Sequence, residues 1–350
     1  MNKFLEEILD QPEALKRTLR YYTSSAGMAS LEKVKKAMSD HQFEQIIFTG
    51  MGSSYFTGFA ASNLFNGLGI PSFVVNASEL LHYNLSLLKK KTLLICFSQS
   101  GESFEIRELL ERLSSNTVCV GILNIEDSTL ALKADIALYS KSGVEEMTST
   151  KTFITTKLVA YILGWYLSGK WDKPRQTQIK KLIYACYKML EHYPSYIGDV
   201  LRFLGDIHAI QIIARGACFA SACQSALMFK EANKIAGTGI LGGEFRHGPM
   251  EMVQEGFQSI LFAPMGKTYS QSIKMAEDIA RFGGKVLLLT NGDKNFDDAN
   301  IFPIQIDCDD EYIFSILSVI PVQILIDEYA KVRGYEAGSF SRGAKVTVVE

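Results

Sequence analysis

The sequence predicts an α/β protein of two tandem lobes, each a parallel sheet between two layers of helices. Near-continuous apolar runs such as Thr92–Phe97 alternate with helix-like segments, which is typical of parallel strands buried on both faces. The same order of elements occurs in residues 35–165 and again in residues 198–335. Because chance similarity rarely preserves such an order, the repeat strengthens the prediction of two lobes with one plan.

The first lobe is predicted to open with a strand, a glycine turn and a helix. These are the apolar run Gln45–Phe48, the turn Gly50–Ser54 and the small-residue segment Tyr55–Phe65. Further strands are expected at Ser72–Val75, Thr92–Phe97 and Val118–Ile122. Ligands of open parallel sheets bind beyond the carboxyl ends of the strands, so the loops after these runs are the candidate binding sites.

The second lobe repeats this order. Its predicted elements are the strand Ala209–Ile213, the turn Arg215–Cys218, the helix Phe219–Asn233 and the strands Ser259–Ala263 and Lys285–Leu289. A helical leader, residues 1–34, precedes the first lobe, and a tail, residues 336–350, follows the second. Residues 166–197 join the lobes, with Lys170–Lys181 read as a connection that leads into a helix, Ile179–Leu190.

Composition indicates a soluble globular protein. Net charge is −2, so no basic field points to nucleic acid. The longest apolar run, Ile313–Ile326, is shorter than the roughly 20 residues of a membrane-spanning helix, and we interpret it as a buried helix. Acidic residues at Glu6 and Glu7 stand where a signal peptide would be apolar, which favours the cytoplasm. The scattered cysteines and five histidines show no metal-ligand spacing, so no metal is expected.

The loop Ser98–Ser103, Ser-Gln-Ser-Gly-Glu-Ser, is a candidate phosphate site. It follows a predicted strand and precedes a periodic helix, where hydroxyl groups and free backbone amides favour an anion. The alternative is that Ser100 or Ser103 only caps the helix. A cap requires one serine, so the full string favours phosphate.

The turn Gly50–Ser54 is a weaker signal. Its glycines allow a tight turn and a close approach of the backbone to a ligand. It lacks the third glycine of a dinucleotide fingerprint, and no acidic residue ends the following strand. We therefore expect no nicotinamide or other cofactor, and a plain strand-to-helix turn remains the alternative.

Glu231 and His247 are the candidate acid–base residues. Gln224, Met228 and Glu231 are spaced by four and three residues and so share one helix face. Taken alone, Glu231 is more often a solvated residue or an ion-pair partner of Lys230 or Lys234. His247 lies in a glycine-rich loop before Pro249, where histidine is uncommon, and an imidazole can serve as acid or base, which favours a chemical role.

Together these strings resemble the sugar-isomerase (SIS) superfamily, and especially the isomerase half of the glutamine–fructose-6-phosphate aminotransferases. The resemblance spans nearly the whole chain. The strings that carry it are Glu7–Pro12, Gly50–Tyr55, Ala77–Leu80, Ser98–Ser103, Ser149–Phe153, Ala226–Glu231, Gly243–Pro249 and Ala344–Glu350. It implies two tandem SIS domains, each with a flavodoxin-like sheet.

The resemblance also implies roles for single residues. Substrate would be held by Gly52, Ser53, Ser54, Ser98, Gln99, Ser100, Ser103, Ser149 and Ala344. Glu231 would move a proton between C1 and C2, His247 would open the sugar ring, and Lys345 would approach the substrate from the tail. The family builds its site at a homodimer interface, which implies a shared active site here.

Three departures narrow the expected reaction. No glutaminase domain precedes residue 1 and no cysteine follows Met1, so use of glutamine is not expected. Met228 stands where the aminotransferases carry a lysine, and Gln224 replaces a glutamate. The expected function is therefore a phosphosugar isomerase, deaminase or deglycase acting on an amino-sugar or fructosamine phosphate. The alternative is a phosphosugar-binding regulator without catalysis.

Overall fold

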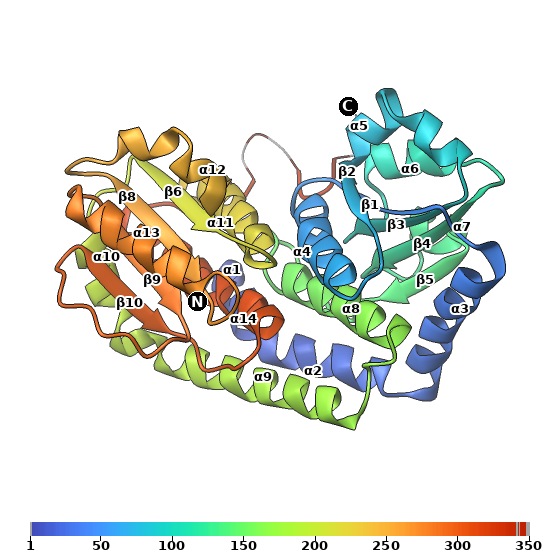
Figure 1. Cartoon of the computed structure of the whole chain (residues 1–350), viewed down its shortest axis with the longest axis horizontal. Coiled ribbons are helices and arrows are strands. Elements are labelled where there is room, and N and C mark those ends of the chain that lie inside the picture. Colours follow the sequence, from blue (N-terminus) through green and yellow to red (C-terminus); the bar gives the residue numbers. More distant parts are fainter. Residues whose placement is uncertain (1, 341, 343, 348–350) are drawn as a thin grey trace. The chain divides into compact units, whose positions relative to one another are not determined.

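The structure is a computed structural model that describes residues 2–340, 342 and 344–347. The chain forms two compact units, each with one sheet. One, here called the β1–β5 unit, comprises residues 10–180 and 340–350; the other, the β6–β10 unit, comprises residues 1–9 and 181–339. Both sheets are five-stranded and parallel with helices on both faces, which confirms the predicted three-layer α/β fold (Figure 1).

In the β1–β5 unit the strand order is β2-β1-β3-β4-β5. The strands are β1 (Gln45–Gly50), β2 (Phe73–Asn76), β3 (Thr92–Ser98), β4 (Thr117–Leu123) and β5 (Ile136–Tyr139). The helices are α2 (Gln11–Tyr22), α3 (Ser25–His41), α4 (Ser53–Gly67), α5 (Ala77–His82), η1 (Leu85–Lys89), α6 (Phe104–Leu110), α7 (Thr129–Lys133) and α8 (Lys151–Leu167).

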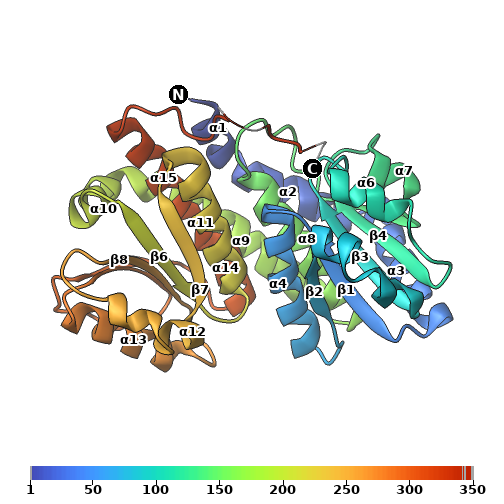
Figure 2. The same cartoon turned by 90° about the horizontal axis from the view of Figure 1, so that it is seen from above.

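Alternation along the strands divides the core of this unit between two faces. Ile47 and Cys96 pack with α5, α6 and α7, whereas Phe48 meets Phe65 of α4 edge-on at 5.0 Å on the other face. Helix α8 packs against α4 and α2 and is buried along almost its whole length (Figure 2). The sheet is covered on both sides, which explains why its strands carry no polar face.

The β6–β10 unit has the strand order β10-β9-β8-β6-β7. Its strands are β6 (Ala209–Ala214), β7 (Ala236–Leu241), β8 (Gln258–Ala263), β9 (Lys285–Thr290) and β10 (Ile301–Gln305). Its helices are α1 (Lys3–Leu9), η2 (Tyr193–Ser195), α10 (Ile197–Leu204), α11 (Cys218–Asn233), α12 (Gly242–Arg246), η3 (Pro249–Met252), α13 (Tyr269–Arg281), α14 (Glu311–Leu317) and α15 (Val319–Val332). Helices α11, α14 and α15 pack together, while α12 and α13 contribute to the core cluster around Ile213 and Leu261.

The apolar run near the C-terminus is a buried helix, as predicted, but it is longer than expected. Helical residues extend over Glu311–Val332, 22 residues that by length and composition alone could cross a membrane. Within the fold 94% of its most apolar window is buried, and Asn2 of the leader donates a hydrogen bond to Asp327 at 2.7 Å. These residues therefore form the core of the unit.

Residues 166–197 were predicted as a helical connection, and only the predicted start of its helix, at Ile179, was wrong. Helix α9 (Lys173–His192) already begins at Lys173, and the boundary between the two units, at residues 180 and 181, falls within it. Asp172 accepts a hydrogen bond from the amide of Arg175 at 2.9 Å and so caps the helix. Pro174 lies in the first turn, where its missing N–H costs nothing, so the polar composition concealed a well-capped helix.

Candidate active site

The serine loop begins where β3 ends, at the carboxyl edge of its sheet. Ser98 is buried; its Oγ accepts a hydrogen bond from the amide of Gly101 at 3.0 Å and lies 3.4 Å from Oγ of Ser103. Ser103 occupies the N-cap position of α6, yet its side chain makes no cap hydrogen bond, and α6 has only seven residues. Ser103 therefore does not cap α6 through its side chain, whereas Oγ of Ser100 accepts a hydrogen bond from the amide of Glu102 at 3.1 Å within the loop.

Contacts with the segment after β4 fix the path of the serine loop. The carboxylate of Glu102 accepts hydrogen bonds from the amide and the hydroxyl of Thr129, at 2.5 and 2.9 Å. The carbonyl of Gly101 accepts from the amide of Leu130 at 3.1 Å. Since both sides of the turn are anchored, the loop holds its shape without a ligand, which lowers the ordering cost of binding one.

We expect Gly101→Ala to disrupt this loop. Gly101 has a φ of +70°, and a Cβ there would fall 2.1 Å from Oγ of Ser128. Backbone strain and the clash together should cost about 1–3 kcal/mol and displace Ser98 and Ser100. Urea unfolding and phosphate binding measure the two effects.

Gly69→Ala is the matched control. Gly69 lies in the same unit with a similar φ of +78°, but nothing stands within 4 Å of a Cβ there. Gly69→Ala should therefore cost only the backbone strain and leave phosphate binding unchanged. Equal phosphate affinity in both variants would contradict the predicted role of the serine loop.

The glycine turn lies beside the serine loop at the same edge of the sheet. A Cβ on Gly50 would fall 2.9 Å from the carbonyl oxygen of Phe97, so the ends of β1 and β3 approach closely only because Gly50 has no side chain. Gly52 has a φ of +51° and precedes Ser53 and Ser54 in the first turn of α4. Both loops are thus available to one ligand at this edge.

The C-terminal tail contacts the β1–β5 unit near the serine loop. Nζ of Lys345 lies 2.7 Å from Oε2 of Glu145 and also contacts the carbonyl of Met147. The carbonyl of Thr347 accepts a hydrogen bond from the amide of Phe104, at the start of α6, at 3.1 Å. Ala344 is exposed, and Val348–Glu350 of the predicted tail lie outside the described residues.

Glu145 is the buried anion of this region, and it was not predicted from the sequence. Its fully buried carboxylate accepts hydrogen bonds from the amides of Thr150 and Thr152, at 2.9 and 3.0 Å. Burial alone would raise the pKa of Glu145, but Lys345 and the hydrogen bonds from Thr152 outweigh it and lower the pKa. Ser149, a predicted substrate ligand in the same segment, pairs its hydroxyl with that of Thr152 at 2.8 Å.

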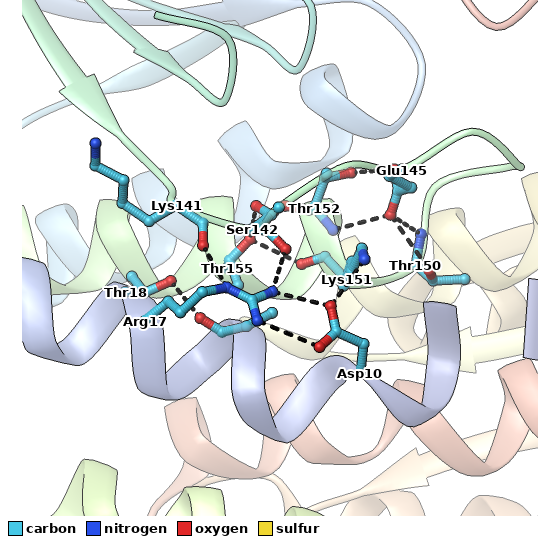
Figure 3. A network of polar contacts seen from close by, with 12 residues as sticks. Asp10, Arg17, Thr18, Lys141, Ser142, Glu145, Thr150, Lys151, Thr152 and Thr155 are labelled. Atoms are coloured by element: carbon cyan, nitrogen blue, oxygen red, sulfur yellow. Dashed lines mark hydrogen bonds and ion pairs between the residues drawn. The ribbon is translucent and has the colours of Figure 1, made fainter. Parts of the chain in front are cut away.

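A second cluster of ion pairs contacts the same segment, which joins β5 to α8 (Figure 3). Asp10 lies 2.9 Å from Arg17 and 2.8 Å from the nearly buried Lys151, and Arg17 also donates to the carbonyls of Lys141 and Ser142. Burial raises the pKa of Asp10, but Arg17 and Lys151 together lower it below its usual value. The segment between β5 and α8 is thereby fixed to α2.

A pocket of about 660 Å³ opens beside these residues, all within the β1–β5 unit. Its lining includes Gln99 of the serine loop, Glu145, Arg17 and Lys141. Gln99 is the only member that we predicted as a substrate ligand. The pocket shows that the serine loop borders an open cavity large enough for a small ligand.

Glu231 and His247 both lie in the β6–β10 unit, whereas the serine loop, Ser149 and Lys345 lie in the other. Glu231 is half-buried in the last turn of α11. On the same helix Gln224 and Met228 are fully buried, so Met228 has the packing role of a core residue. Helices α11 and α12 both pack against β7, so the same strand positions Glu231 and the loop that carries His247.

The loop around His247 is anchored by its neighbours. Phe245 is fully buried in the core cluster with Ile213 and Leu261, and Arg246 pairs with Asp278 of α13 at 2.7 Å. His247 follows directly and is exposed, with Gly248 in a positive-φ conformation after it. The loop is held in place, while the imidazole of His247 remains accessible to a ligand.

Comparison with known proteins decides the family. The SIS domain model matches residues 41–164 and again residues 203–326, together more than half of the chain. The chain belongs to the SIS domain family.

Relatives and solved structures agree with this result. The glutamine–fructose-6-phosphate aminotransferase of Pyrococcus horikoshii is 28% identical over 99% of this chain, but the match covers 57% of that protein, so the chain spans little more than half of its length. The C-terminal domain of the corresponding Francisella tularensis enzyme superposes with a TM-score of 0.85 at 23% identity, covering 97% of this chain and 98% of that one. A glucosamine-6-phosphate deaminase from Thermotoga maritima gives a TM-score of 0.74 at 20% identity, covering 99% and 100%.

The two SIS domains contain only part of the candidate site. The serine loop and Ser149 fall within the first match, and Glu231 and His247 within the second. Asp10, Arg17 and Lys345 lie outside both. Family matching therefore covers the sheet-edge loops, while the contacts that Asp10, Arg17 and Lys345 make with the first SIS domain come from the structure.

Proposed function

We propose that this chain is an enzyme that acts on an amino-sugar phosphate or a fructosamine phosphate. The serine loop is the basis of this proposal, because it stands at the sheet edge with Gln99 lining an open pocket, and the Ser103 hydroxyl makes no helix-cap hydrogen bond. Membership of the SIS family and the similarity to phosphosugar enzymes support it. The phosphate supplies binding energy away from the reacting carbons and orients them.

In the proposed reaction Glu231 takes a proton from the carbon next to a carbonyl or imine and returns it to the neighbouring carbon. This transfer interconverts the aldose and ketose forms. When the intermediate is an imine, attack by water then releases the amine, which His247 protonates as it leaves. A glutamate carboxylate can accept the proton from the substrate carbon, and a histidine imidazole can give or accept the ring proton. Lys345 would approach the substrate from the tail.

A homodimer with a shared active site and a cytoplasmic location belong to the same proposal. The similarity to the isomerase half of the aminotransferases supports the shared site. The resemblance implies that the histidine loop crosses to the partner, so its test is the mixing of two inactive variants, one altered in the serine loop and one altered at His247. A shared site would restore activity in the mixed dimer.

A turnover screen tests the proposed function. Purified protein is offered glucosamine 6-phosphate, fructose 6-phosphate with ammonia, and fructosamine 6-phosphate adducts. Released ammonia or amine and aldose–ketose interconversion are followed together. Turnover of one of these compounds would establish the enzyme and its reaction. Binding without turnover of any of them would favour the regulator instead.

His247→Asn separates ring opening from proton transfer. We expect the variant to lose about 10²-fold or more in turnover of a cyclic substrate, in line with the usual contribution of a positioned acid–base group. A 5-deoxy ketose 6-phosphate cannot close its ring, so its isomerisation should be much less affected. An equal loss on both substrates would contradict a ring-opening role for His247.

A further inference from the structure

The β6–β10 unit has a pocket of its own at the carboxyl edge of its sheet. The pocket has a volume of about 480 Å³ and lies where the loops after β6, β7 and β8 meet. Its lining consists of polar and charged side chains and one glycine: Arg215, Gly243, Arg246, His247, Ser270, Gln271 and Lys274. Among the residues that the structure describes, no carboxylate belongs to this lining.

Arg215 is the central observation. It follows the last residue of β6, is half-buried, and its guanidinium lies against the backbone of Gly242, where a Cβ would fall 2.8 Å from its Nε. Within the described part of the chain the structure gives Arg215 no hydrogen bond and no ion pair. Burial and the charge of Arg246 lower the pKa of Arg215, which reflects a cation held without a compensating anion.

The neighbouring carboxylate does not supply the missing charge. Asp278 is buried, and three cations share it: Arg246 at 2.7 Å, Lys274 at 3.1 Å and Arg281 at 2.9 Å. Two of these, Arg246 and Lys274, also line the pocket. The lining therefore carries three cations. The one neighbouring carboxylate, Asp278, is not part of the lining and also pairs with Arg281, so the lining has an excess of positive charge.

We propose that this pocket is a second anion site, which binds the phosphate group of a small phosphorylated metabolite. A guanidinium offers paired N–H donors that match phosphate oxygens, and Lys274, Ser270 and Gln271 add further donors at the same cavity. A phosphate dianion matches the excess charge of the lining better than a monovalent carboxylate does. The inference goes beyond the proposed function, which places the substrate phosphate at the serine loop, and binding of phosphate in this pocket does not depend on catalysis.

Counting bound phosphate tests the site. The full chain is dialysed against radiolabelled inorganic phosphate at low ionic strength, and we expect two sites per chain. Arg215→Ala with Lys274→Gln should remove one site or weaken it at least tenfold, while the Gly101→Ala change in the serine loop should remove the other. Lys267→Ala, which removes an exposed cation that does not line the pocket, should leave both sites intact.

The outcomes separate this inference from the proposed function. One phosphate lost with Gly101→Ala and unaffected by Arg215→Ala and Lys274→Gln would overturn the second site, as would no binding at all. One phosphate lost only with the pocket variants would support it and count against the serine loop. Lys274→Gln alone changes an exposed side chain, so it decides the matter should Arg215→Ala not fold.

Discussion

Glu231→Gln is expected to lower turnover by about 10²- to 10⁴-fold, the usual contribution of a positioned general base. The amide keeps the size of the side chain but cannot accept the proton from the substrate carbon. Phosphate binding should persist, because the serine loop lies in the other unit of the chain. Steady-state turnover with the substrate identified in the screen, together with phosphate binding, measures both effects.

The position of Glu231 allows this substitution to be made without disturbing the core of the unit. It is half-buried at the end of α11, while Gln224 and Met228 on the same helix supply the fully buried contacts. The exchange should therefore leave the fold intact, and urea unfolding checks this. Glu255→Gln, at an exposed position in the same unit, is the control and should retain full turnover. Unchanged turnover in Glu231→Gln would remove Glu231 from the mechanism.

Seven of the ten strands in the described residues were predicted, because their signal is local, whereas β5, β7 and β10 were not. Strands buried on both faces are continuous apolar runs, and the runs ending at Phe97, Ile122 and Leu289 coincide with β3, β4 and β9. The serine loop was found for the same reason, since its position after a strand can be read from the sequence. Helix α9 was misplaced because its polar first turn resembles a connection until the cap by Asp172 is seen.

The partners of the site residues were not predictable in this way. Glu145 looks like any glutamate in a loop, and only the fold brings Lys345, 200 residues later in the chain, to its carboxylate. Arg215 reads as one residue of a glycine turn, and its lack of a counter-ion depends on how Gly242 and α13 pack beside it. Charge compensation depends on which residues the fold brings close together, and a single sequence has no pattern that predicts this.

The largest effect on stability is expected from Glu145→Ala. The change leaves the amides of Thr150 and Thr152 without their buried acceptor and Lys345 without its anion. Breaking a buried, hydrogen-bonded ion pair typically costs about 3–5 kcal/mol. Urea unfolding at pH 7 should show a loss of this size. Glu146→Ala, which changes the exposed neighbouring carboxylate, should cost much less.

The pH dependence of this effect has a definite sign. The pKa of Glu145 is lower in the folded chain than in the unfolded chain, because Lys345 and Thr152 outweigh the effect of burial. Its contribution is therefore fully present above the unfolded value of about 4.3 and is lost as pH falls through the folded pKa. The stability difference between the wild type and Glu145→Gln should shrink below that pH. A difference that stays constant down to pH values near 3 would show that the charge of Glu145 does not hold the tail and the loop together.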